Sequence, residues 1–176
     1  MRRRSLLASL GATGLAAVAG CGALGGDDTP DEQSSMEYDD LAARNLYLAS
    51  GVSVSLPADV TEVAAPDEAD LVVLQDTTDV GADTGIEWLA SGTGVAFVGS
   101  EGQSALLDWM ESDAYDEAFE SRGVGEGSPP PDFMLAFGID RQYISTYSYT
   151  WNDDAGTTDE RILDGIEESL HDLQNR

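Results

Sequence analysis

The sequence predicts an α/β fold: a single three-layer sandwich domain at residues 37–176, with a mainly parallel sheet and an antiparallel edge pair. Two apolar runs, within 69–76 and at 95–98, are typical of strands buried on both faces of a sheet. Helical patterns alternate with these strands, which favours helices that cover a parallel sheet. About 140 residues suffice for one hydrophobic core.

The first elements of the domain are expected to be a helix and two strands. Residues 37–50 place leucines amid polar residues and end before Gly51, which predicts a helix. Residues 52–56 alternate apolar and polar side chains, which predicts a strand that Pro57 stops. The apolar run within 69–76 follows and is expected to form the centre of the sheet.

Two helices and a strand are expected in the middle of the domain. Residues 84–100 predict a short helix, a glycine-rich turn and the second apolar strand. Residues 101–120 have a helical pattern that is expected to kink or restart at Ser112. Ser100, with Gln103 three residues later, predicts a capping box at the start of this helix.

A strand pair and a helix are expected at the end of the domain. Residues 133–139 and 142–151 are rich in β-prone side chains and flank a two-residue break, which predicts a hairpin-like edge pair. Residues 157–176 repeat apolar side chains at helical spacing and predict a helix with one apolar stripe. Thr157 and Glu160 predict its capping box.

An aromatic row marks the second strand of this pair. Its four members occupy odd positions and therefore share one face of the strand: Tyr143, Tyr147, Tyr149 and Trp151. Such a row is expected to pack under a helix, here the last one. If that face is open instead, it offers an aromatic surface to a sugar, a peptide or a partner protein.

The N-terminal region has the order typical of an export signal, and residues 1–20 are predicted to be a signal peptide. Arg3 and Arg4 belong to a basic start, an uncharged stretch follows, and small residues precede Cys21. Because Cys21 is the only cysteine, a disulfide within the chain is excluded. Residues 21–36 continue with glycine, serine, proline and acids, which predicts a flexible acidic tether.

Two motifs in this region resemble known targeting signals. Arg3 and Arg4, followed by a serine and two leucines, resemble the twin-arginine signal for export of folded proteins. Residues 18–20 before Cys21 resemble the lipobox of bacterial and archaeal lipoproteins. The resemblance implies lipid on Cys21 and a membrane anchor at the extracytoplasmic face. The open alternative is an uncleaved transmembrane helix at 6–24, which also leaves the domain outside.

The charge balance is strongly acidic, with 34 Asp and Glu residues against 8 arginines and no lysine. Since three arginines belong to residues 1–20, the part from Cys21 onward has a net charge of −29. Such self-repulsion destabilises a compact domain, except at molar salt, where the Debye length is about 3 Å. The composition and the signal together resemble proteins of extremely halophilic archaea. A nucleic-acid partner is not expected, because phosphate binding needs clustered basic residues.

The candidates for catalysis are few. Ligands in open α/β sheets bind beyond the carboxyl ends of strands, which directs attention to Asp76, Asp79, Ser100 and the pair 140–141. A Ser100 nucleophile would need a base, and His171 is the only histidine. The G-x-S-x-G pattern of a nucleophile elbow is absent around Ser100, so a helix cap is the preferred interpretation and no catalytic residue is predicted.

No cofactor or metal site is predicted either. Carboxylates at 76, 79 and 83, or at 153, 154 and 159, are of the type that binds calcium or magnesium. Neither group has the spacing of a calcium loop, and a hydrated acidic face is the simpler expectation. The sequence has no P-loop and no dinucleotide fingerprint.

Residues 41–100 resemble the ThuA-like and class I glutamine-amidotransferase-like folds in the segments ADLVVL and WLASGTGVAFVG. The chain departs from those amidotransferases at Gly99 and Ser100, which stand where their nucleophilic cysteine is placed. We therefore expect a surface lipoprotein whose domain binds an unknown protein or small molecule. The alternative is a hydrolase or amidotransferase-like enzyme that uses the strand-end loop around Ser100.

Overall fold

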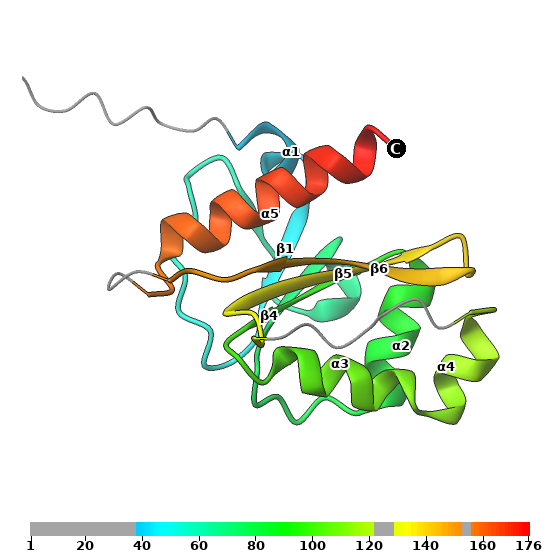
Figure 1. The fold of residues 1–176 in the computed structure, drawn as a ribbon. Coiled ribbons are helices and arrows are strands. Elements are labelled where there is room, and N and C mark those ends of the chain that lie inside the picture. Colours follow the sequence, from blue (N-terminus) through cyan, green and yellow to red (C-terminus); the bar gives the residue numbers. More distant parts are fainter. Residues whose placement is uncertain (1–37, 122–128, 153–155) are drawn as a thin grey trace, which may run out of the picture. The chain divides into compact units, whose positions relative to one another are not determined.

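The computed structural model describes residues 38–121, 129–152 and 156–176. They form one six-stranded sheet with the strand order β2-β1-β3-β4-β5-β6, covered by helices on both faces (Figure 1). In chain order the elements are α1 (Asp39–Ala42), β1 (Asn45–Leu48), β2 (Thr61–Glu62), the 3₁₀ turn η1 (Pro66–Glu68), β3 (Leu71–Gln75), α2 (Ala82–Ser91), β4 (Gly94–Val98), α3 (Gly102–Met110), α4 (Asp113–Ala118), β5 (Phe133–Ile139), β6 (Tyr143–Tyr149) and α5 (Asp159–Gln174).

The sheet is mainly parallel and ends in an antiparallel pair, as the sequence predicted. Strands β2, β1, β3 and β4 run parallel, β5 pairs antiparallel with β4, and β6 pairs antiparallel with β5. The two continuous apolar runs form β3 and β4, next to each other inside the sheet. The α/β fold class and the three-layer architecture are therefore confirmed. The predicted signal peptide, lipobox and tether, with Arg3, Arg4 and Cys21, lie outside the described residues.

Two hydrophobic cores lie on the two faces of the sheet. Because side chains alternate along a strand, Val72 and Leu74 of β3 enter the core under α2, α3 and α4. Leu71 and Val73 enter the other core, which α1 and α5 cover. All four side chains are at most 1% exposed, which explains why β3 reads as an uninterrupted apolar run.

The aromatic row packs on the α5 side of the sheet. Tyr147, Tyr149 and Trp151 contact the core beneath α5. The hydroxyl groups of Tyr149 and Ser169 lie 2.9 Å apart and share a hydrogen bond between β6 and α5. The prediction that this row packs under the last helix is confirmed for these three residues.

The expected helix at 37–50 is wrong in its second half. Only Asp39–Ala42 is helical, and Asn45–Leu48 form strand β1 between β2 and β3. Leu46 is fully buried in the α5-side core, while Tyr47 packs against the opposite core. Pairing with β3 therefore imposes a two-residue alternation that overrides the helical spacing of the leucines.

The expected strand at 52–56 is also wrong. Its three apolar side chains pack against the α5-side core and its serines are exposed, so the predicted alternation of faces is present. No strand is assigned to these residues. The backbone N–H of Ser55 donates instead to Oδ2 of Asp159 at the start of α5, at 2.9 Å.

The start of α4 agrees with the prediction from the sequence, and the start of α5 differs from it by one residue. Ser112 restarts the helical segment as predicted, because its Oγ accepts a hydrogen bond from the Tyr115 N–H at 3.3 Å. Helix α5 begins one residue later than expected. Thr158, rather than Thr157, is the N-cap, and its Oγ1 accepts from the Arg161 N–H at 3.4 Å.

The hairpin between β5 and β6 has the two-residue turn that the sequence indicated. Asp140 and Arg141 both adopt positive φ angles, 46° and 59°, as a type I′ turn requires. The Gln142 N–H donates to the Ile139 carbonyl oxygen at 2.7 Å and closes the turn. Within the described ranges, no helix has the length and apolar character needed to cross a membrane.

Candidate functional site: a pocket at the strand-order reversal

The order of the strands reverses between β1 and β3. From β1 the chain moves outward to β2, and β3 then lies on the other side of β1. The loops that follow β1 and β3 therefore leave the sheet in opposite directions at its carboxyl edge. In open α/β sheets, the crevice at such a reversal is the usual place for a ligand.

A cavity of about 640 Å³ opens at this point, and we call it the switch-point pocket. Its volume is in the range typical of small-molecule sites. Its less polar wall consists of Tyr47, Ala49, Pro66, Leu74, Val80, Gly81 and Trp88. Its polar side chains are Ser50, Gln75, Thr77, Thr78, Asp79 and Thr84.

The β1 side of the switch-point pocket is fixed by contacts with β3. The Ala49 N–H donates to the Val73 carbonyl oxygen at 2.9 Å, which extends the β1–β3 pairing by one residue. The Gln75 side chain then donates from Nε2 to the Gly51 carbonyl oxygen at 2.5 Å. Gly51 has a φ of 97°, which only glycine adopts readily, so the loop can turn back toward Gln75.

Helix α3 contacts the loop after β3, which forms the other side of the pocket. Trp109, which is 4% exposed, donates from Nε1 to the Val80 carbonyl oxygen at 3.2 Å. The Val80 N–H donates in turn to Thr78 Oγ1, also at 3.2 Å. A side chain of the core therefore positions the loop that carries Thr77, Thr78 and Asp79. The pocket is preformed in this structure.

The carboxylates at 76, 79 and 83, which were considered as cation ligands, do not converge. Asp79 lines the switch-point pocket, whereas Asp83 lines a separate hollow between α2 and α4. Asp76 lines a third hollow of about 260 Å³ on the α5 side of the sheet. The described residues contain no group of three His, Cys, Asp or Glu side chains that could hold a metal ion. Asp153 and Asp154 of the second group considered lie outside them.

Ser100 is not the helix cap that the sequence predicted. Helix α3 begins at Gly102, and its N-cap is Glu101, whose side chain makes no capping bond. The Asp76 carboxylate takes that place, because its Oδ2 accepts a hydrogen bond from the Glu101 N–H at 3.2 Å. Gly99 allows this contact, since a Cβ there would lie 2.2 Å from Asp76 Oδ2. Ser100 itself is exposed.

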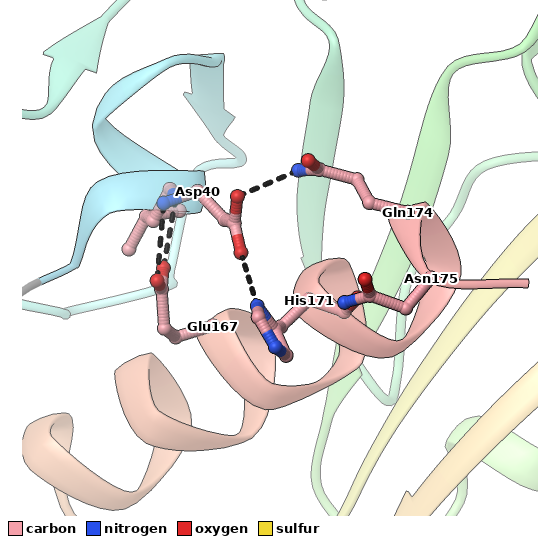
Figure 2. Close-up of polar contacts among 6 residues, drawn as sticks. Asp40, Glu167, His171, Gln174 and Asn175 are labelled. Carbon is pink, nitrogen blue, oxygen red and sulfur yellow. Dashed lines mark hydrogen bonds and ion pairs between the residues drawn. The ribbon is translucent and has the colours of Figure 1, made fainter. Parts of the chain in front are cut away.

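His171 lies in the last turn of α5. Its Nδ1 is 3.1 Å from Oδ2 of Asp40, on α1 (Figure 2). The first residue of α5, Asp159, shares the small α5-side hollow with Val98, two residues before Ser100. His171 is twelve positions after Asp159 in this helix, which corresponds to about 18 Å at 1.5 Å per residue. The structure therefore does not bring Ser100 and His171 together.

The pair Asp140 and Arg141 lies at the opposite edge of the sheet from the switch-point pocket. Strand β5 is antiparallel to β4, with Phe133 beside Val98, so its last residue is at the amino edge of the parallel strands. The expectation that this turn joins the other strand-end loops is wrong. That expectation required β5 to run in the same direction as β3 and β4.

Sequence reasoning found the β3 loop of the pocket and missed its β1 side. Tyr47 belongs to the segment 37–50 that was expected to be helical, and Trp88 belongs to the helix expected within 84–100, where no motif distinguishes it. No protein-family model, curated protein or solved structure matches the chain. The assignment of a binding site therefore depends on the position of the switch-point pocket, its volume and the side chains that line it.

Proposed function

We propose that this protein is a surface lipoprotein, anchored by lipid on Cys21 at the extracytoplasmic face of the cell membrane, whose α/β domain binds a small molecule. The lipobox-like residues 18–20 and the basic pair Arg3 and Arg4 support the anchor. The single observation that carries the binding role is the preformed switch-point pocket, at the place where open α/β sheets bind ligands.

The side chains that line the pocket favour binding over catalysis. An active site for acyl transfer or hydrolysis needs a nucleophile and a base within hydrogen-bond reach of each other. Among the described residues, those that line this pocket include hydroxyl groups, one amide and one carboxylate, but no His, Cys, Lys or Arg. This lining suits selective binding, in which a few polar groups orient a ligand against apolar walls.

The anchor is tested by comparing the wild-type chain with Cys21→Ser. We expect the wild-type protein in the membrane fraction, extracted only by detergent, with an intact mass that begins at Cys21 and includes acyl chains. Cys21→Ser removes the sulfur that would carry lipid and is expected to abolish the adduct. An unmodified wild-type chain that still begins at Met1 would contradict the lipid anchor.

The binding role is tested by recording ¹H–¹⁵N correlation spectra of the full chain with Cys21→Ser during titration with a defined set of neutral, cationic and anionic fragments. Binding in the switch-point pocket would move the amide signals of residues 49–51 and 75–84. Shifts confined to other residues, or no shift with any fragment, would contradict the assignment of this pocket.

A further inference from the structure

We infer that the switch-point pocket takes a small organic cation, such as an alkylated amine or a quaternary ammonium compound. This inference rests on the proposed function of the pocket and specifies the class of its ligand. It combines three properties of the lining: aromatic walls, one carboxylate without a basic neighbour in the lining, and neutral hydroxyl groups.

Two aromatic side chains from different elements wall the pocket. Tyr47 comes from β1 and Trp88 from α2, and both are partly exposed while also packing against the core. Tryptophan and tyrosine rings attract cations through the negative potential of their faces, and alkylated ammonium groups also gain from apolar contact with them. Rings held by a core lose little freedom when a ligand binds.

The only Asp, Glu, Lys, Arg or His residue among the described lining residues is Asp79. Asp79 is exposed beside the pocket, and the described lining residues include no Lys, Arg or His. A bound ammonium group therefore meets a counter-ion that is hydrated in the free protein, so little desolvation opposes the pairing.

The same carboxylate argues against an anionic ligand, although the pocket includes the start of a helix. Gly81, the N-cap of α2, lines the pocket and would be the natural donor to a phosphate. Asp79 precedes it and carries the only formal charge among the described lining residues, so an anion would meet a carboxylate without a neutralising arginine in the lining. The hydroxyl groups of Thr77 and Thr84 carry no charge and suit a polar substituent of a cation.

The test is a matched pair of ligands: choline and its neutral isostere 3,3-dimethyl-1-butanol, which has carbon in place of the charged nitrogen. Both are titrated into the full chain with Cys21→Ser at one fixed KCl concentration that maintains the fold, followed by ¹H–¹⁵N spectra. We expect both to shift residues 49–51 and 75–84, with choline bound about tenfold more tightly. Asp79→Asn should weaken choline binding about threefold, because an exposed carboxylate supplies only part of that preference, and should leave the alcohol unchanged.

Asp59→Asn is the control, because Asp59 is another exposed aspartate that lines none of the described pockets discussed above. It should leave choline binding unchanged, and an equal loss in both variants would overturn the inference in favour of the general negative field. Equal or tighter binding of the alcohol in the pocket would overturn the cationic class but keep the pocket as a binding site. If neither compound nor any fragment shifts these residues, the proposed binding function fails as well.

Discussion

Gly138 of β5 lies against the C-terminal turn of α2. A Cβ at this position would come within 2.1 Å of the Leu89 carbonyl oxygen and 3.1 Å of the Phe119 ring. A backbone oxygen at the end of a packed helix cannot move aside as a flexible side chain can. The absence of a side chain at residue 138 therefore sets how closely the sheet and α2 approach each other.

Gly138→Ala is expected to lower the free energy of unfolding by about 1–3 kcal/mol, because the added methyl group forces α2 away from β5. Denaturant titration followed by circular dichroism measures the change. Gly81→Ala is the matched control, since a Cβ at Gly81 would have no atom within 4 Å, and it should stay within about 0.5 kcal/mol of wild type. An equal effect of both substitutions would contradict the steric argument.

Tyr38 connects α1 to α5 through its hydroxyl group. The hydroxyl donates to Asp164 Oδ1 at 3.0 Å. Burial, this hydrogen bond and nearby carboxylates raise the pKa of Tyr38 from 10.0 to about 12. The folded chain therefore holds this proton more tightly than the unfolded chain does. The resulting stabilisation is complete below pH 10 and is lost as the pH rises toward 12.

Tyr38→Phe should reveal this pH dependence. At pH 8 we expect the variant to be less stable than wild type by about 1 kcal/mol, the net value of one hydrogen bond. The difference in the free energy of unfolding should shrink between pH 10 and pH 12. Urea titrations of both proteins across this range measure it, and a difference that does not change with pH would exclude the proposed origin.

Helix α1 shows how an element too short to be stable alone is maintained. It has four residues, fewer than an isolated helix needs in water. The Glu167 carboxylate of α5 accepts hydrogen bonds from the Asp40 and Leu41 N–H groups, at 3.0 and 2.8 Å (Figure 2). Gln174 Nε2 also donates to Asp40 Oδ1, at 2.7 Å. Helix α5 thus supplies the cap that the sequence of α1 lacks.

Glu167→Ala is expected to cost about 0.5–2 kcal/mol, as loss of a helix cap does. Hydrogen exchange should show a local effect: the Asp40 and Leu41 amides of α1 should exchange faster than in wild type, while the amides of the sheet should not. Glu168→Ala is the control because the neighbouring Glu168 is exposed and the Asp40 and Leu41 N–H groups donate to Glu167 instead. Uniform acceleration across the domain in both variants would contradict a local role for Glu167.

The elements that the sequence predicted correctly are those whose own pattern is decisive. Strands β3 and β4 are apolar without interruption because both of their faces are covered, and α5 has one clear apolar stripe. The segment 45–48 has only one fully buried side chain, Leu46, and its identity as a strand comes from pairing with β3. Such long-range pairing leaves little trace in the local sequence.

The switch-point pocket could not be predicted from the sequence for the same reason. Its location follows from the strand order, and the order could not be derived while β1 was expected to be helical. The side chains that line it, such as Tyr47 and Thr84, are ordinary for a strand and a helix, so they carry no motif. Asp79 was identified because it follows a recognisable strand, whereas the direction of β5, which moves residues 140–141 away, required the structure.

The charge of the whole molecule leads to a prediction about salt. With 34 acidic residues and 8 arginines, repulsion opposes folding unless counter-ions screen it. We expect the melting temperature and the far-UV circular dichroism of the full chain to increase from 0.1 M to 3 M KCl. NaCl at equal concentration should act similarly if screening is the cause. Identical melting at both KCl concentrations would contradict a salt-dependent fold.

Helix α1 precedes the amino end of β1, and the switch-point pocket opens beyond the carboxyl end of that same strand. The length of β1 therefore separates α1, the first described helix of the chain, from the mouth of the switch-point pocket.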